Sequence, residues 1–204
     1  MFFICHLNAK EIKVIFLSII VTFSINLFTQ NRMESICEGG VCKLYYSLAE
    51  QLECFFKQAE KNNQHLDVAI VIGVDPLTLL ASQAIAPIDH DELEIAGALH
   101  GKALDVVKCK NSEIRVPANA EMVIEGRILP NEKELEGPFG EFPKYYSARE
   151  NREVIQVDLL THRKNPIYHT IIPAEMEHLL LGAIPRESTL LSHLQRSFQG
   201  VMDV

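Results

Sequence analysis

The sequence of 204 residues has no tryptophan, no Cys-x-x-Cys pair and no long run of basic side chains. Its five cysteines are odd in number, so a disulfide framework like that of small secreted domains is not indicated. Cys37 and Cys42 flank a Gly-Gly pair, but a zinc knuckle needs a second pair or close histidines, and the nearest histidine downstream is His65. We therefore do not favour zinc, and the cysteine usage indicates the reducing cytoplasm.

The charge balance is acidic, with 27 Asp and Glu against 19 Lys and Arg and a formal net charge of −8. Proteins that neutralise nucleic-acid phosphates concentrate Lys and Arg, so nucleic acid is not expected as a partner. Apolar residues make up 48% and charged residues 23% of the chain, which excludes collagen, a coiled-coil rod and a low-complexity linker. At roughly 100 to 200 residues per domain, the length suits one domain with its own core.

A mainly apolar segment from Val14 to Phe28 differs from the rest of the chain and follows Lys10 and Lys13. It is shorter than the roughly 20 residues that span a bilayer, and it lacks the small-residue cleavage site of a signal peptide. Three interpretations stay open: a membrane anchor, a buried β-rich segment, or sequence foreign to the domain. We favour the last, and the first would associate the protein with a membrane.

From residue 47 onward the pattern indicates well-formed helices and strands. Ser47 and Glu50 form a capping box for a helix that ends near residues 62–63, and the apolar run from Asp67 to Gly73 predicts a buried strand. Asp75 followed by a proline predicts the start of a second helix. Because the Asp75 carboxylate itself caps this helix, we do not expect an anion site at the turn.

The second half of the chain is rich in strands separated by turn formers, which favours an α+β fold with an antiparallel sheet or barrel. A final helix is predicted from Ser188 to Val204. The expected strands are Leu104 to Cys109, Glu113 to Val116, Glu121 to Leu129, Val154 to Thr161 and Ile167 to Ile172.

Three places carry candidate chemistry. Glu125 lies in mid-strand, where a carboxylate needs solvent, an arginine such as Arg127, or a metal ion. The loop from Glu136 to Glu141 has two glycines and a proline that give it a rigid backbone, so it is either a surface turn or a support for a ligand. Glu175 and Glu177 follow a proline, and either a proton donor or compensation of a helix dipole would explain them.

The motifs together resemble the UbiD-like decarboxylase family in order and spacing, over about Ala49 to Arg196. They are VAIVIGVDP, DELEIAGALHG, VKC, VPANAE leading to IEG, EGPFGEF and EHLLLGAIPRE. The resemblance implies a split β-barrel that binds flavin, with flanking helices. It also implies a carboxy-lyase that reversibly and non-oxidatively decarboxylates aromatic or α,β-unsaturated acids. The commonest substrate association in the family is a polyprenyl hydroxybenzoate in quinone biosynthesis.

The resemblance implies roles for four residues. Glu125 matches a ligand of the divalent cation that bridges the cofactor phosphate, and Glu177 matches the acid that protonates the substrate carbon, with Glu175 as the fallback. Pro117 and Ala118 match backbone close to the flavin. The implied cofactors are prenylated FMN, Mn²⁺ or Mg²⁺, and K⁺. A flavin prenyltransferase would supply the flavin, and intact family members are expected to be homo-oligomers.

The chain also departs from the family. Members are more than twice as long, and the segment that should deliver a metal-binding histidine has none between His6 and His65. We therefore expect residues 1–46 to be a divergent hydrophobic segment and residues 47–204 to be the flavin-binding domain, without the family's C-terminal domain. Such a fragment should bind metal and cofactor poorly alone. The alternative is a flavin-binding or subunit-interaction module that another chain completes.

Overall fold

The computed structural model describes residues 48–86, 91–138, 140–141 and 143–204, and the backbone of three short strands nearer the N-terminus. Its main sheet has six strands, and every pairing in it is antiparallel. The strand order is β1-β8-β7-β4-β3, with β2 also paired to β8. The six strands are β1 (Phe2–Cys5), β2 (Lys13–Ile15), β3 (Asn26–Phe28), β4 (Leu66–Ile72), β7 (Met122–Glu136) and β8 (Glu150–Arg163).

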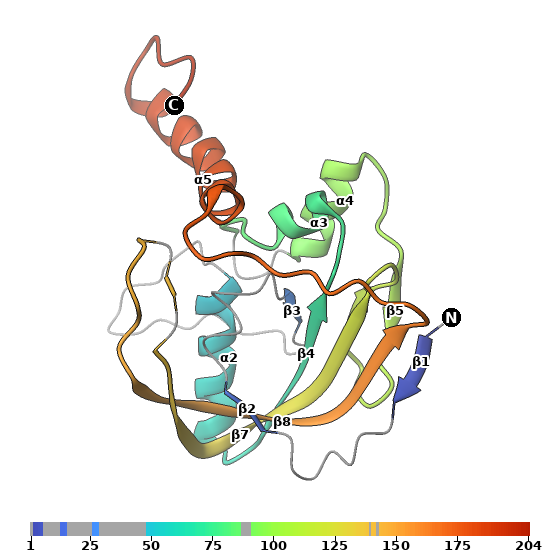
Figure 1. Cartoon of the computed structure of the whole chain (residues 1–204). Coiled ribbons are helices and arrows are strands. Elements are labelled where there is room, and N and C mark those ends of the chain that lie inside the picture. The colour runs from blue at the N-terminus through green and yellow to red at the C-terminus, as the bar shows by residue number, and fades with distance from the viewer. Residues whose placement is uncertain are drawn as a thin grey trace.

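Different elements pack on the two faces of this sheet (Figure 1). Helix α2 (Leu48–Lys61) lies on one face, and a two-stranded hairpin, β5 (Val106–Lys108) with β6 (Arg115–Pro117), packs on the other. The remaining helices are α3 (Pro76–Ala81), α4 (Glu92–His100) and α5 (Met176–Ser197). Figure 1 shows α5 projecting away from the body of the molecule.

The apolar side chains of the strands form two clusters, one on each face of the sheet, because successive side chains of a strand point to opposite faces. The cluster under α2 contains Leu52, Phe55, Phe56, Ala59, Leu66, Val68, Ile70, Ile72, Ile128 and Ile155. The cluster under the hairpin contains Ala69, Val71, Cys109, Ile114, Val116, Ala120 and Val123. The second cluster attaches the hairpin to β4 and β7, which brings the hairpin loop over the first residues of β7.

The predicted α+β architecture, the strand near residues 67–73 and the Asp75 helix cap are confirmed. The Asp75 carboxylate accepts hydrogen bonds from the amides of Leu77 and Thr78. Within the described residues the strands form an open sheet and a hairpin, and no closed barrel is formed. The partner residue of the capping box, Ser47, lies outside the described residues.

Two predictions about the C-terminal region are wrong. Residues 167–172 are not a strand: the side chains of Ile167 and Ile172 are exposed, and the Ile167 amide bonds to a side chain instead of a sheet neighbour. The last helix begins at Met176 rather than Ser188 and ends at Ser197. It runs through Pro185, whose ring removes one backbone donor from the helix.

The hydrophobic segment from Val14 to Phe28 is described in part. Its ends belong to β2 and β3, which pair with β8 and β4 respectively. The residues between them lie outside the described part of the chain, as do Cys37 and Cys42. Among the described residues, no helix is both long enough and apolar enough to cross a membrane.

Candidate functional site

Glu125 is the fourth residue of β7 and is buried, with 3% of its surface exposed. Its Oε1 accepts a hydrogen bond from the amide of Lys110 at 2.9 Å, and its Oε2 accepts one from the amide of Asn111 at 2.7 Å. Both donors lie in the loop between β5 and β6. The carboxylate therefore connects this loop to the central strand through two charge-assisted hydrogen bonds.

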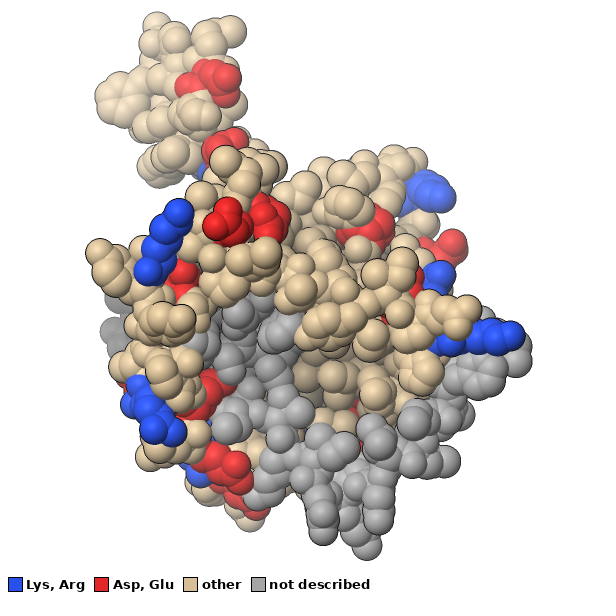
Figure 2. Space-filling model, in the orientation of Figure 1, with Lys and Arg blue, Asp and Glu red and all other residues tan. Residues whose placement is uncertain are grey.

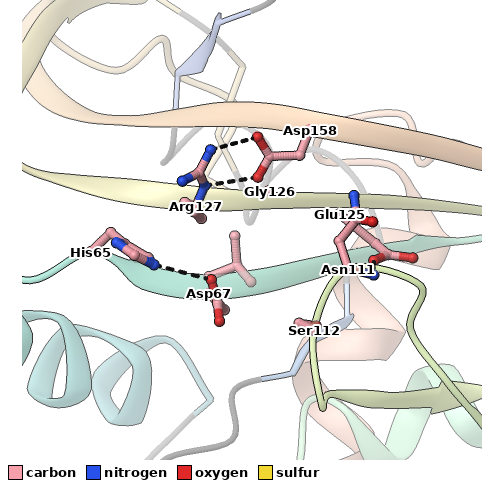
Figure 3. A pocket seen from close by; sticks show the side chains of 9 residues that line it. His65, Asp67, Asn111, Ser112, Glu125, Gly126, Arg127 and Asp158 are labelled. Carbon is pink, nitrogen blue, oxygen red and sulfur yellow. Dashed lines mark hydrogen bonds and ion pairs between the residues drawn. The ribbon is translucent and has the colours of Figure 1, made fainter. Parts of the chain in front are cut away.

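Of the three alternatives for Glu125, the structure does not show the pairing with Arg127. Arg127 forms a bidentate pair with Asp158, at 2.9 Å from Nε and 2.8 Å from Nη2 (Figure 3). The reason is a register shift: Glu125 lies opposite Leu159 and Gly126 lies opposite Val157, so Asp158 is the extra residue of β8. Sequence reasoning missed Asp158 because a bulge leaves no signal in the alternation of one strand.

These groups line a polar cavity of about 500 Å³ on the sheet. The lining residues are His65, Asp67, Val68, Asn111, Ser112, Glu125, Gly126, Arg127 and Asp158. His65 pairs with Asp67 across 3.5 Å, beside the Arg127–Asp158 pair (Figure 3). The lining contains three carboxylates, and both Arg127 and His65 lie within 4 Å of one of them.

A divalent cation such as Mn²⁺ needs about six oxygen or nitrogen donors. Within the described ranges no group of three His, Cys, Asp or Glu side chains is arranged to hold a metal. Glu125 offers one carboxylate, and each of its oxygens already accepts an amide hydrogen bond. The described residues alone therefore do not make a complete metal site.

Cys109 lies beside Glu125 at the start of the same loop. Burial and the negative charge of Glu125 raise the pKa of the Cys109 thiol to about 12, although a hydrogen bond with Ser112 acts in the opposite direction. The thiol is therefore neutral near pH 7. It packs as an apolar side chain in the cluster under the hairpin.

Pro117 and Ala118 lie at the other end of β6, away from the loop that holds Glu125. Pro117 is fully buried, and the Ala118 amide donates to the carbonyl of Asp105 at 2.9 Å. Neither residue lines the cavity around Glu125. The hairpin thus carries Pro117 and Ala118, two of the predicted site residues, at its base. Its loop contacts a third predicted site residue, Glu125.

Asp75 forms a second polar cluster near this base. Its Oδ1 lies 2.9 Å from His100 Nε2, and its Oδ2 accepts hydrogen bonds from the Thr78 hydroxyl at 2.7 Å and the Asn119 amide group at 3.4 Å. Partial burial by itself raises the pKa of Asp75, but the hydrogen bonds from Thr78 and Asn119 and the charge of His100 outweigh burial, so the pKa is lowered. The Asp75 carboxylate thus accepts hydrogen bonds from the first free amides of α3.

Glu177 lies in the first turn of α5 and is exposed. Its Oε1 accepts a hydrogen bond from the Ile172 amide at 3.3 Å, and the neighbouring His178 Nδ1 accepts one from the Ala174 amide at 3.1 Å. Glu175 is the helix cap, but its side chain makes no capping hydrogen bond. The cavity that contains Glu125 does not include Glu177, so the described residues do not bring these two together.

The loop from Glu136 to Glu141 is partly described, and residue 139 lies outside the described ranges. Glu136 is 5% exposed, and Gly140 forms a β-bridge with Tyr146. Gly137 has a φ of +91°, in the left-handed region that favours glycine. The bridge to Tyr146 and the left-handed Gly137 are the backbone features of the described part of this loop.

A family model described as the 3-octaprenyl-4-hydroxybenzoate carboxy-lyase Rift-related domain, UbiD, matches residues 32–176. The anhydromevalonate phosphate decarboxylase of Methanothermobacter thermautotrophicus is 37% identical over 153 residues, which are 75% of this chain and 36% of that protein. Relatives of this chain are therefore decarboxylases.

Solved structures agree with the sequence relatives. The UbiD-class enzyme HmfF from Pelotomaculum thermopropionicum, in complex with FMN, matches with a TM-score of 0.76 and 43% identity, over 86% of this chain and 41% of that one. An evolved dimeric form of HmfF was solved with prenylated FMN. Vanillic acid decarboxylase from Sedimentibacter hydroxybenzoicus matches with a TM-score of 0.71 and 28% identity, over 87% of this chain and 40% of that one. The chain thus spans less than half the length of these relatives, and it belongs to the UbiD family.

Proposed function

We propose that this chain contributes the flavin-binding domain of a prenylated-FMN-dependent decarboxylase. The observation that supports this most is the β5–β6 hairpin, whose loop amides hold the buried Glu125 and whose base carries Pro117 and Ala118. In this proposal the sheet and hairpin form part of a split β-barrel, residues 47–204 make up the domain, and residues 1–46 are a divergent segment.

Pro117 and Ala118 would border the flavin. Ala118 is half-buried at a turn and carries only a methyl side chain. When bound, prenylated FMN supplies the electron sink for loss of CO₂, whereas the chain supplies orientation and a proton. A flavin prenyltransferase would provide this cofactor. Since part of the pocket belongs to the remaining length of the relatives, we expect FMN to bind this chain weakly but saturably.

Glu125 would be one ligand of a divalent cation, Mn²⁺ or Mg²⁺, at the cofactor phosphate, with K⁺ nearby. The two amide hydrogen bonds from the hairpin loop fix the direction of this buried carboxylate, which supports a specific role, and each oxygen keeps a further lone pair. The described residues supply no complete donor set, so further ligands would have to come from elsewhere. We derive no reaction step from the metal.

Glu177 would donate the proton that replaces CO₂ on the substrate carbon. Its exposure in the first turn of α5 makes the carboxyl group accessible, and His178 lies directly beside it in the sequence. A carboxylic acid in this role must carry its proton when the substrate carbon is protonated after CO₂ has left, and it must be reprotonated after each turnover. Glu175 remains the alternative donor.

The substrate class is a small carboxylic acid, aromatic or α,β-unsaturated. The names of relatives give four acids to compare: a 4-hydroxybenzoate bearing a polyprenyl chain, vanillic acid, 3,4-dihydroxybenzoic acid and anhydromevalonate phosphate. A role in quinone biosynthesis would require the first of these. We place the reaction in the cytoplasm.

The test is decarboxylation by the chain after coexpression with a flavin prenyltransferase, measured for each acid with the chain alone and with the chain completed by a second polypeptide that carries the relatives' remaining length. The variants are compared in the completed enzyme. Glu177→Gln should abolish product formation and leave flavin absorbance unchanged, whereas the matched variant Glu175→Gln should retain turnover. Loss of turnover in Glu175→Gln alone would transfer the donor role to Glu175. Turnover by both variants would remove this helix end from the mechanism.

A second candidate function is a flavin-binding or subunit-interaction module that another chain completes. The observation that favours it is α5, which has 22 residues and no buried side chain among them. Its exposed apolar side chains include Leu180, Ile184 and Leu190, and Figure 2 shows this projection carrying few charged residues on the face in view. Homo-oligomers through this helix would be the simplest arrangement. If decarboxylation requires a second polypeptide with the relatives' remaining length, the module is favoured.

A further inference from the structure

The turn between β6 and β7, from Pro117 to Glu121, is attached to several separate parts of the chain. The Ala118 amide donates to the carbonyl of Asp105 before β5. The Glu121 amide donates to the carbonyl of Gly73 at the end of β4, at 2.9 Å. Gly73 has a φ of +74°, and a Cβ there would lie 2.6 Å from the Glu121 side chain. This close approach fixes one end of the turn against β4.

Arg163, the last residue of β8, holds the middle of the same turn. Its Nη2 donates to the carbonyl of Asn119 at 3.0 Å and its Nε donates to the carbonyl of Ala120 at 3.3 Å. Its own amide donates to the carbonyl of Glu121 at 3.0 Å, and its Nε lies 3.8 Å from the Glu121 carboxylate. One planar guanidinium thus binds two successive carbonyls, which its fixed fork of donors permits and an ammonium group does less well.

The opposite side of the turn is held by Asp75. The Asn119 side chain donates to Asp75 Oδ2, and His100 and Thr78 bind the same carboxylate. Asp75 is therefore itself fixed by α3 and α4. The turn lies between this cluster and Arg163, so a displacement of either would change where Pro117 and Ala118 lie.

We propose that Arg163 is a positioning residue that fixes the turn from Pro117 to Glu121 for contact with the flavin. This inference rests on the proposed function, in which Pro117 and Ala118 border the ring. Arg163 is not among the residues that line the cavity around Glu125, and it does not belong to the first turn of α5. Its side chain is 45% exposed, so the effect passes through the two carbonyls it binds rather than through burial in the core.

The experiment compares the full chain with Arg163→Gln, Arg163→Lys and the control Arg149→Gln, an exposed arginine that precedes β8. FMN is titrated into each protein and its fluorescence is followed, and amide hydrogen exchange is measured by mass spectrometry without flavin. Arg163→Gln should weaken FMN binding about tenfold, since loss of a charge-assisted contact has that order of effect. Arg163→Lys should fall between Arg163→Gln and the wild type, and the control should match the wild type.

Amide hydrogen exchange distinguishes a positioning role of Arg163 from a general stabilisation of the fold. In Arg163→Gln, exchange should become about tenfold faster in residues 118–121 while β4 keeps its protection. Unchanged exchange in the turn, faster exchange with unchanged FMN affinity, or equal loss of protection in β4 would each overturn the inference. A wild-type chain that binds no FMN would contradict the proposed function instead, and exchange alone would then decide whether Arg163 fixes the turn.

Discussion

Replacing Glu125 by glutamine tests the best-defined contact of the candidate site. The two Glu125 oxygens each accept an amide hydrogen bond from the hairpin loop, and the side chain is 3% exposed, so solvent cannot replace either bond. Glutamine offers one acceptor oxygen, and its NH₂ group would face the second amide, donor against donor. A hydrogen bond to a charged group contributes about 1.5–3 kcal/mol, so we expect a loss of about 2–4 kcal/mol in the free energy of unfolding.

The assay is urea-induced unfolding followed by far-UV circular dichroism at pH 7. The matched control is Glu113→Gln on the same hairpin, where the carboxylate is exposed and pairs with Lys108 at the surface. Exposed ion pairs contribute little, so this variant should lie within about 0.5 kcal/mol of the wild type. If Glu125→Gln also lies within about 0.5 kcal/mol, the carboxylate is not held by the loop and the description of the site fails.

Three further predictions concern stability and reactivity. Because the pKa of the Cys109 thiol is about 12, roughly one thiol in 10⁴ is ionised at pH 8, so iodoacetamide should label the peptide containing Cys109 slowly until urea unfolds the chain. Gly126→Ala places a Cβ 2.4 Å from the backbone oxygen of Gln156 and should destabilise the chain by about 2–4 kcal/mol in urea unfolding; a change near zero would contradict the bulge geometry. Because the pKa of Asp75 is lowered below 3.8, its ionised form stabilises the folded state above that pH, and the contribution is lost as pH falls through the folded-state pKa. The difference in unfolding midpoint between the wild type and Asp75→Asn should therefore stay constant above about pH 5 and shrink as the pH falls below 3.8, and a difference that stays constant into this acid range would contradict it.

Local sequence patterns predicted the parts of the fold that depend on local physics. The apolar run from Asp67 to Gly73 predicted β4 because a strand buried on both faces needs no alternation. Asp75 predicted a helix start because its carboxylate bonds amides two and three residues away. Both the buried strand and the helix cap depend on residues that are close together in the sequence, so local sequence patterns can reveal them.

Contacts between distant segments could not be predicted in this way. The partner of Arg127 is Asp158 because a bulge in β8 shifts the register, and the partners of Glu125 are amides of a loop on another hairpin. The role of Arg163 depends on carbonyls, which every residue has and which leave no mark in a sequence. The predicted strand at residues 167–172 failed for a related reason: its composition suits a strand, but the chain there contacts Glu121 and not a sheet edge.

The most direct test of the account is native mass spectrometry of this chain after coexpression with a flavin prenyltransferase. The account predicts a population whose added mass equals one prenylated FMN per chain, at a lower level in the Arg163→Gln variant. A wild-type spectrum that contains only the bare chain, from a protein shown by circular dichroism to be folded, would contradict the claim that this domain binds the flavin.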